Sequence, residues 1–520
     1  MAETSSSFDL TNYPKVAIDF SPPIPPLKKT ADKTKIDVRY SLIAPFASVH
    51  IYWNPKIYEL VYEIEEPLLN STEEQYKNQI IEAMRDIINF DVVVEKEQEK
   101  LLDYLDKRFK FLATEFGLKM SYETYQKIYY YICRDFIGMN EVEPLLRDYF
   151  VEDIECNGVD TPVYIVHRAY RNIKTTLMFN DMDRLASFVE KLAQRTGKYI
   201  SYASPILDAT LPDGSRVNAT YTKDITSRGP TFTIRKFTKT PWTPTQLISF
   251  KTLSPEMLAY LWILVQYKMN ILITGGTSSG KTSLLNAIAF FIPPESRVVS
   301  IEDTRELNLP RENWLPSVVR TATGGGETGE ISLFTLLRSS FRQNPDYVIV
   351  GEVRGKETSV LFQGMASGHS SISTIHADSV DTVIKRLETP PIELSPTLLN
   401  VLDCVCIMTH AVVNKQETRK LKEIVEIINV TPDGVAMTNT PFRWNASDDH
   451  FYFKKTSKIF EKITKRYGVD LSELELEFRK RVQLIYNLYT KKIFEFEDIQ
   501  KIIVEYYKKP EEVLKRFGVL

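Results

Sequence analysis

Cysteine is scarce in this sequence. Only four of its 520 residues are cysteine: Cys133, Cys156, Cys404 and Cys406. None of them forms the paired CxxC spacing that structural zinc sites use, and four are too few for a disulfide scaffold in a chain of this length. The sequence therefore excludes a small disulfide-rich secreted domain, and a reducing cytoplasm is the simplest environment for it.

A long apolar run is also missing. A membrane-spanning helix needs roughly 18 or more uninterrupted apolar residues. The best candidate, Tyr260 to Thr274, is interrupted by Gln266, Lys268 and Asn270. The first ten residues, MAETSSSFDL, show no basic region followed by an apolar stretch, so no secretory signal is visible. Any membrane association is therefore expected to be peripheral.

Neither sign of charge dominates. The 65 Lys and Arg residues nearly balance the 68 Asp and Glu residues, which gives a net charge of −3. This balance argues against a protein whose main partner is a nucleic-acid backbone, because such proteins carry a positive excess. The 43% hydrophobic content supports an ordinary globular chain of two or more domains.

Changes in composition divide the first half of the chain. Residues 1–40 are rich in proline, which lacks the amide donor and fixes φ, so we expect a disordered tail. Residues 41–237 form a predicted N-terminal domain, with a helical part first and an α+β part of short alternating segments after it. Residues 238–244 interrupt all periodicity and are the predicted linker.

The second half alternates strands and helices. In residues 245–456 short apolar strands, such as Asn270 to Thr274, alternate with helical patterns, which indicates a parallel sheet covered by helices. Residues 457–520 return to helical periodicity with two apolar stripes, so a helical C-terminal segment is expected. The predicted fold class is α/β, with an N-terminal α+β domain and a helical C-terminal end.

A phosphate-binding loop is the most specific motif. The sequence GGTSSGKT, residues 275–282, follows an apolar strand and opens a helix. Glycines let main-chain N–H groups surround a phosphate, while Lys281 reaches the β and γ oxygens and the Thr282 hydroxyl binds Mg²⁺. A chance match is expected only about two times in a hundred in a chain of this length. The residues predicted to hold the nucleotide are Gly275, Gly276, Thr277, Ser278, Ser279, Gly280, Lys281, Thr282 and Ser283.

Two glutamates follow later strands of the same half. Glu302 ends a strand at residues 297–301, where a carboxylate can orient or deprotonate an attacking water. Glu352 follows the apolar strand at residues 347–350 and can act on Mg²⁺ or on that water. Charge pattern alone favours a solvated acidic loop for Glu302 by roughly two to one, and a buried strand that ends in a charge is about as common as the functional case for Glu352. Their order after the phosphate loop favours the functional interpretation for both.

Two histidines flank another strand-like stretch. His369 and His376 stand seven residues apart in GHSSISTIHA. This separation on a strand does not suit a pair of metal ligands, which must converge. An imidazole can instead sense a γ-phosphate, although a structural hydrogen-bonding role is the commoner use of either histidine taken alone.

These four motifs, in this order, resemble the Walker A motif, Asp box, atypical Walker B motif and His box of the type II/type IV secretion ATPase superfamily, whose members are hexameric RecA-like motors. The match is dense over about residues 195–410. The resemblance implies a RecA-like P-loop ATPase domain that uses ATP and Mg²⁺. It also implies that Glu302 and Glu352 share water activation and metal positioning, with Thr282 and Glu352 at the metal and His369 and His376 as the His box.

The resemblance extends to four arginines. Members of the superfamily bring arginines of the N-terminal domain onto the nucleotide, and Arg216 and Arg235 stand on the matching strands. Arg338 and Arg342, four residues apart, resemble the phosphate-facing pair of the superfamily. The alternative for each of them is a surface salt bridge, which is the usual role of an arginine.

Further details narrow the resemblance to one branch. The tetracysteine zinc element of bacterial type II secretion members is absent, and residues 314–332 and 337–346 look like archaeal secretion ATPases. The long N-terminal part and the helical C-terminus resemble the archaellum assembly and rotation ATPase, with archaeal pilus-assembly or secretion ATPases as the alternative. Two other classes fit the sequence less well. A RecA-like nucleic-acid motor would need a basic channel, whereas the net charge is −3. A scaffold that binds nucleotide without hydrolysing it would have lost the carboxylates, whereas Glu302 and Glu352 are present.

The resemblance also implies the setting of such a motor. We expect a homo-oligomer, a hexamer, in the cytoplasm and peripheral to the inner face of the cell membrane. Its expected partners are a polytopic membrane platform protein and accessory motor proteins, and no nucleic acid. Residues 1 to about 29 combine lysines with apolar side chains, which would suit binding to a partner or to membrane lipid, with a passive tail as the alternative.

Overall fold

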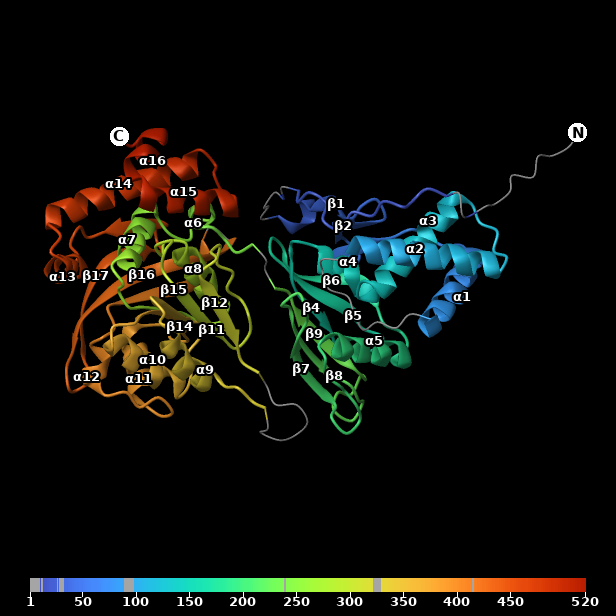
Figure 1. Ribbon diagram of the computed structural model, residues 1–520, viewed down its shortest axis with the longest axis horizontal. Helices are drawn as coiled ribbons and strands as arrows, with labels where there is room; N and C mark the ends of the chain where they lie inside the picture. The colour runs from blue at the N-terminus through green and yellow to red at the C-terminus, as the bar shows by residue number, and fades with distance from the viewer. Residues whose placement is uncertain are drawn as a thin grey trace, which may run out of the picture. The chain divides into compact units, whose positions relative to one another are not determined.

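The computed structural model describes residues 10, 13–25, 27, 32–87, 98–237, 240–320, 329–413 and 416–520. The chain divides into two compact units, Met1–Phe237 and Thr238–Leu520 (Figure 1). Of the predicted linker at 238–244, residues 238 and 239 lie outside the described part. Its last residue already begins helix α6 (Pro244–Ser249), which Thr243 caps through a reciprocal capping box with Gln246.

The first unit is built on one nine-stranded sheet, in the order β1-β2-β3-β6-β5-β4-β9-β8-β7. The strands are β1 (Asp37–Ile43), β2 (Ala47–Asn54), β3 (Glu59–Glu65), β4 (Val151–Cys156), β5 (Pro162–His167), β6 (Arg171–Met178), β7 (Ile206–Thr210), β8 (Arg216–Thr220) and β9 (Thr231–Arg235). Its described helices are α1 (Ser71–Ile87), α2 (Gln98–Glu115), α3 (Tyr122–Phe136), α4 (Glu143–Arg147) and α5 (Met182–Arg195), with short 3₁₀ turns at Lys33–Lys35 and Asn140–Val142.

The order predicted for this unit, a helical part followed by an α+β part, needs correction. Three antiparallel strands, β1 to β3, come before the helices. Strand β3 then pairs in parallel with β6, so the early strands join the later ones in a single sheet. These early residues form strands because buried and less buried side chains alternate along them. In β2, for example, Val49 and Ile51 are buried and their neighbours are less so.

The predicted tail at residues 1–40 is also corrected. Residues 1–9, 11–12, 26 and 28–31 lie outside the described part, but Tyr13, Val16, Ile18 and Phe20 pack on the unit. Leu10 and Val16 are 3% and 5% exposed in a cluster with α1, α2 and α3. The Tyr13 hydroxyl donates to the Met120 carbonyl at 2.8 Å, and the Asp19 N–H donates to the Ala44 carbonyl at 2.9 Å. Proline prevents a helix here, yet an extended segment can still bury its apolar side chains.

The second unit contains another nine-stranded sheet, in the order β12-β11-β13-β14-β10-β15-β16-β17-β18. Its strands are β10 (Ile271–Thr274), β11 (Val298–Glu302), β12 (Trp314–Val318), β13 (Tyr347–Val350), β14 (Ser370–Ile375), β15 (Cys404–Val413), β16 (Gln416–Val430), β17 (Ala436–Asn445) and β18 (His450–Phe453). The strands from β12 to β15 pair in parallel, and β16 to β18 continue the sheet in antiparallel fashion. The alternation of strands and helices did not predict this antiparallel extension.

The described helices of this unit after α6 are α7 (Pro255–Gln266), α8 (Lys281–Ala289), α9 (Leu333–Ser340), α10 (Glu357–Ala366), α11 (Val380–Glu388), α12 (Pro396–Leu399), α13 (Lys458–Tyr467), α14 (Leu471–Thr490), α15 (Phe496–Lys508) and α16 (Pro510–Arg516), with the 3₁₀ turn η5 (Phe341–Gln343) after α9.

Helices cover both faces of that sheet (Figure 1). Ile271 and Ile273 of β10 pack into one apolar cluster with α7, α8 and the C-terminal helices, whereas Leu272 packs into another with α9, α10 and α11. The predicted α/β, RecA-like fold class with a helical C-terminal end is confirmed.

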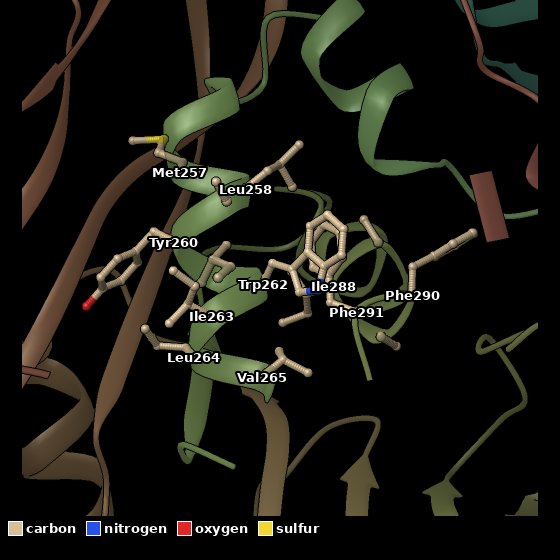
Figure 2. Close-up of a cluster of buried hydrophobic side chains, with 14 of the residues drawn as sticks. Met257, Leu258, Tyr260, Trp262, Ile263, Leu264, Val265, Ile288, Phe290 and Phe291 are labelled. Carbon is tan, nitrogen blue, oxygen red and sulfur yellow. The ribbon is translucent and has the colours of Figure 1, made fainter. Parts of the chain in front are cut away.

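Helix α7 contains the first part of the best apolar run of the sequence, residues 260–266, and β10 contains its end. Its residues from Met257 to Val265 are all buried, and Figure 2 shows their side chains leaving the helix on several sides. The Trp262 ring stacks on Phe291, which follows α8, at a centroid distance of 4.9 Å, and its indole N–H donates to the Tyr507 hydroxyl of α15. The helix is therefore a core element, and no helix in the described residues is long and apolar enough to cross a membrane.

Candidate active site

Parallel pairing brings the ends of four strands to one edge of the second sheet. Thr274 of β10 lies opposite Ile375 of β14, and Val350 of β13 lies opposite Ile301 of β11. The residues that follow these positions therefore share the carboxyl edge, where open α/β sheets bind ligands. The phosphate loop, Glu302, Glu352 and His376 all lie at this edge.

The loop between β10 and α8 has the backbone that an anion cradle requires. Gly275 and Gly280 have φ of 150° and 95°, in the region that glycine occupies readily. A Cβ on Gly275 would lie 2.5 Å from the Met408 carbonyl oxygen and 2.6 Å from Ser279 Oγ, so no side chain fits there. The loop thus leads into the N-terminus of α8, where unpaired N–H groups and the helix dipole favour a phosphate.

Lys281 lies inside this loop. Its side chain is 7% exposed, and Nζ donates to the carbonyl oxygens of Gly275 and Gly276 at 3.1 and 3.0 Å. Burial lowers the pKa of the lysine, and the nearby Glu352 carboxylate opposes that effect. The ammonium group is therefore already positioned where a phosphate on the loop would meet it.

Glu302 is the most deeply buried carboxylate of this edge. It is 2% exposed, and its Oε1 accepts the N–H groups of Glu306 and Leu307, both at 2.9 Å. Its Oε2 is buried without a hydrogen-bond partner among the described atoms. Burial raises the pKa of Glu302 to about 7, although the two N–H bonds act in the opposite direction. A carboxyl group with this pKa can exchange a proton near neutral pH.

The glycine in the atypical Walker B position has a local explanation. A Cβ on Gly351 would lie 3.2 Å from Cγ of Glu302, tighter than ordinary side-chain contacts. The Gly351 N–H also donates to the Ile301 carbonyl, which fixes the spacing of the two strands. Glu302 therefore fills the space next to β13 that a side chain at residue 351 would need.

Glu352 lies in a chain of charged side chains. Arg354 donates to both of its oxygens, from Nε at 2.9 Å and from Nη2 at 2.8 Å, and His376 Nε2 lies 2.9 Å from Oε1. On the other side of the imidazole, Lys281 Nζ lies 3.3 Å from His376 Nδ1. Burial raises the pKa of Glu352, but Arg354 outweighs this effect with help from His376 and Lys281, and the net shift is downward.

The same contacts determine the tautomer of His376. Lysine can only donate, so Nδ1 accepts, and Nε2 carries the proton that faces the carboxylate. Burial lowers the pKa of His376, whereas Glu352 raises it, and the net shift is downward. His376 is thus a neutral link between Lys281 and Glu352.

The structure separates the two predicted histidines. His376 follows β14 at the carboxyl edge, whereas His369 precedes the same strand at the opposite edge, so the strand of six residues separates them by about 20 Å. The His369 ring contacts Phe341 of η5 at a centroid distance of 4.9 Å. Within one subunit, His369 is not part of this site, because parallel pairing sends the two ends of β14 to opposite edges.

The predicted arginines are not gathered at the phosphate loop within the second unit. Arg342 is exposed in η5, near the edge at which β13 begins, and Arg338 is exposed on α9 with its guanidinium 5.7 Å from the Phe334 ring. Arg216 and Arg235 belong to the first unit, where they are register partners on β8 and β9. They form exposed ion pairs with Asp208 and Asp153, both at 3.0 Å. Their contact with a nucleotide remains a prediction.

The residues present fit a magnesium nucleotide. In the described residues, no three His, Cys, Asp or Glu side chains gather as a metal site of their own. Magnesium bound with phosphates needs only one or two protein ligands and keeps several waters. Thr282 in the first turn of α8 and Glu352 would supply those ligands, and the buried Ser279 Oγ and Glu302 Oε2 lack partners among the described atoms.

Sequence reasoning missed Arg354. It occupies the position two residues after Glu352 in VGEVRG, and its main-chain N–H donates to Glu357 Oε1 at 2.7 Å, which fixes the turn before α10. The short spacing to a predicted catalytic carboxylate was the available signal. An arginine so close to a glutamate can reach it whenever the chain turns, as it does here.

Comparison with known proteins identifies the class. Residues 139–434, more than half of the chain, match the family described as "Type II/IV secretion system protein". The chain belongs to this family. The uncharacterized protein MJ0900 of Methanocaldococcus jannaschii is 34% identical over 487 residues, which cover 89% of this chain and 87% of that protein. The type IV secretion system protein PtlH of Bordetella pertussis is 34% identical over 228 residues, 40% of this chain and 67% of that protein.

Solved structures give a looser similarity. The VirB11 ATPase from the Brucella suis type IV secretion system, in complex with sulphate, is 26% identical, with coverage of 54% of this chain and 92% of that one and a TM-score of 0.28. The Legionella pneumophila ATPase DotB is 16% identical; the match covers 69% of this chain and 93% of that chain, with a TM-score of 0.40.

Proposed function

We propose that this chain hydrolyses ATP as the motor subunit of a secretion-type machine. The observation that carries the proposal is the carboxyl edge of the second sheet. There a phosphate loop with a buried lysine meets two carboxylates whose pKa values are shifted in opposite directions. When the pKa values of two neighbouring carboxyl groups are shifted apart, one group commonly acts as the base and the other stabilises charge.

Glu302 is the general base in this proposal. It is buried, its pKa is about 7, and one of its oxygens has no partner among the described atoms. A water next to that oxygen could pass its proton to the carboxylate as it attacks the γ-phosphate. The two main-chain N–H groups on the other oxygen hold the carboxyl group in place during this transfer.

Lys281, His376 and Glu352 respond to the phosphates. Lys281 moves its donors from the loop carbonyls to the β and γ oxygens, which releases His376 Nδ1 from the ammonium group. Glu352, whose pKa is shifted downward, is ionised at neutral pH and, with Thr282, would hold the metal through oxygen ligands. Magnesium, when bound, neutralises charge on the transferring phosphoryl group.

The machine in this proposal is an archaellum, in which a hexamer of this chain drives assembly and rotation of the filament through a polytopic membrane platform. The similarity to an archaeal protein over 87% of that protein's length supports an archaeal setting. Assembly of an archaeal type IV pilus, or secretion, is the second candidate, and the similarity to a type IV secretion system protein favours it. Arg216, Arg235, Arg338 and Arg342 would complete the nucleotide site on domain closure or from a neighbouring subunit.

Hydrolysis is tested with purified full-length protein and three variants. Lys281→Ala should lose ATP binding and turnover, whereas Glu302→Gln and Glu352→Gln should keep binding and lose at least ~100-fold in turnover. The matched control is Glu312→Gln, an exposed carboxylate before β12, which should stay within about twofold of the parent. Parent-like turnover in Glu302→Gln would refute its role as base.

The cellular role is tested by deleting the gene and restoring it with the parent or with Lys281→Ala. An archaellum motor predicts loss of swimming filaments that only the parent restores. Loss of surface pili with normal swimming would favour the second candidate. The neighbouring genes provide independent evidence, because the gene of an archaellum motor is expected beside the genes for the filament subunit and the platform protein.

A further inference from the structure

A buried amide on α8 contacts the segment of chain that follows Glu302. Asn286 lies one turn after Thr282 and is 4% exposed. Its Nδ2 donates to the carbonyl of Glu306 at 3.2 Å and to the carbonyl of Thr282 at 3.3 Å, and its Oδ1 accepts the main-chain N–H of Asn308 at 3.1 Å. This one side chain therefore joins the phosphate-loop helix to the chain that leaves β11.

The segment between β11 and β12 depends on such contacts for its position. The structure describes all of residues 303–313, and they form neither helix nor strand, so regular main-chain hydrogen bonds do not fix them. Leu307 is fully buried in the apolar cluster that includes α8. At the far end of the segment, Arg311 Nη2 donates to the carbonyl of Ile292 at 2.7 Å. Asn286 supplies polar contacts at the near end.

This near end carries the two donors on the buried carboxyl group. The N–H groups of Glu306 and Leu307 both donate to Glu302 Oε1 at 2.9 Å. Asn286 bonds the carbonyl of the first of these residues and the N–H of Asn308, which follows the second. The amide thus holds the chain on both sides of the two donors.

We propose that Asn286 is a positioning residue for the general base: through its bonds to residues 306 and 308 it keeps the two main-chain donors on Glu302. This inference rests on the proposed function, since it takes Glu302 to be the base. Because α8 begins at Lys281, one helix would then position both the phosphates and the carboxyl group that activates water. A loss of about 1 Å in such positioning is enough to slow a reaction strongly.

Several groups act on the pKa of Glu302. Burial has the largest effect and raises it, and the two N–H donors lower it; Glu306 raises it and Arg305 lowers it. After β13, the residue next to the carboxyl group is Gly351, which has no charge. The charged side chains on its own segment, on α8, on α9 and just after β13 are Arg305, Glu306, Lys281, Arg338, Glu352 and Arg354.

Loss of the Asn286 amide should act through the two donors. All of these charged side chains remain when residue 286 is replaced. Leu307 would stay packed in the apolar cluster, so Glu302 would stay buried while its N–H donors are held less well. Since those donors lower the pKa of Glu302, their weakening should raise it.

Asn286→Leu tests the proposal in the full-length protein, because leucine keeps the shape of the side chain and removes its hydrogen bonds. The kcat for ATP at pH 7 should fall about tenfold, with KM within about twofold of the parent. The midpoint of the pH profile of kcat should rise above about 7. A parent-like kcat, or a midpoint that stays in place or falls, would overturn the proposal. Asn286→Ala should shift both quantities in the same direction and replaces the leucine variant if that variant does not fold.

The control for a general loss of stability is Val265→Ala, at a fully buried position of α7. It should lower the unfolding temperature and keep the kcat and the midpoint of the parent. If it moved the midpoint as far as Asn286→Leu does, the effect would be one of stability, and the positioning role would be wrong.

Urea unfolding of the nucleotide-free protein gives a measurement that does not depend on turnover. A higher pKa in the folded state means that more stability is lost as the pH rises, so Asn286→Leu should lose more than the parent between pH 5.5 and pH 9. Combined with Glu302→Gln, the same substitution should leave the pH dependence unchanged. Equal pH dependence in Asn286→Leu and the parent would overturn the proposal.

The failure of this inference differs from the failure of the proposed function. If Glu302→Gln keeps parent-like turnover, the assignment of the base is wrong, and the role of Asn286 is wrong with it. If Glu302→Gln loses turnover while Asn286→Leu keeps the kcat and midpoint of the parent, only the role of Asn286 is wrong.

Discussion

Replacing Glu302 by glutamine should stabilise the protein at alkaline pH while it removes turnover. The amide oxygen of glutamine can keep both N–H bonds, from Glu306 and Leu307, that Glu302 Oε1 accepts. What the substitution removes is the need to hold a charge at a position that is 2% exposed. Active-site residues commonly reduce stability in this way.

The magnitude follows from the shifted pKa. Burial raises the pKa of Glu302 from the usual 4.5 to about 7, so the folded state holds this proton more tightly than the unfolded state does. The stabilisation from the bound proton is complete below about pH 4.5 and is lost as the pH rises through about 7. Between pH 5.5 and pH 8, this single group should lower the free energy of unfolding by about 2 kcal/mol.

The assay is urea unfolding of the nucleotide-free protein at pH 5.5 and at pH 8, with Glu312→Gln as the control. The parent and the control should lose stability over this interval by about 2 kcal/mol more than Glu302→Gln does. In parallel, turnover of the parent should rise with pH with a midpoint near 7, since only the ionised carboxylate can accept a proton. The same pH dependence of stability in Glu302→Gln and the parent would refute the reasoning.

Three further predictions concern the surroundings of the site and the fold. Gly351→Ala should lower kcat about tenfold with little change in ATP affinity, because its Cβ would push against Cγ of Glu302; parent-like kinetics would contradict this. Arg354→Ala should tighten Mn²⁺ binding in the presence of nucleotide, because Glu352 loses a cation that competes with the metal, and the free energy of unfolding should change by less than about 1 kcal/mol. Electron paramagnetic resonance measures the Mn²⁺ affinity, and an unchanged affinity would count against that competition. Val16→Ala should destabilise the first unit by about 1–2 kcal/mol in thermal unfolding, whereas a tail without contacts would show no change.

The sequence predicted those parts of the site that depend on short-range pattern. Strand, glycine-rich loop and helix follow one another in the phosphate loop, so Gly275 to Thr282 could be assigned without any tertiary information. The fold class followed from the alternation of apolar strands and helices. Once the parallel pairing of the strands is known, the common edge of Glu302, Glu352 and His376 follows, because parallel strands end on the same side.

Contacts between strands distant in sequence could not be predicted in this way. The packing of Glu302 against Gly351 depends on the register of β11 against β13, which no local pattern specifies. His369 shares a motif with His376 but lies at the other end of β14, because a strand carries its two ends to opposite edges. The tail was misjudged because proline content indicates the absence of helix, and not the absence of packing.

The hydroxyl of Tyr507 connects the C-terminal helices to the end of α8, the helix that begins at the phosphate loop. It accepts the indole N–H of Trp262 and donates to the carbonyl of Phe291, which lies just beyond the last turn of α8. Helix α8 begins at Lys281, so a rigid rod of about 14 Å joins the phosphate loop to this tyrosine. Under the proposed function, a displacement of the phosphate loop on ATP binding would therefore be transmitted along α8 to α15.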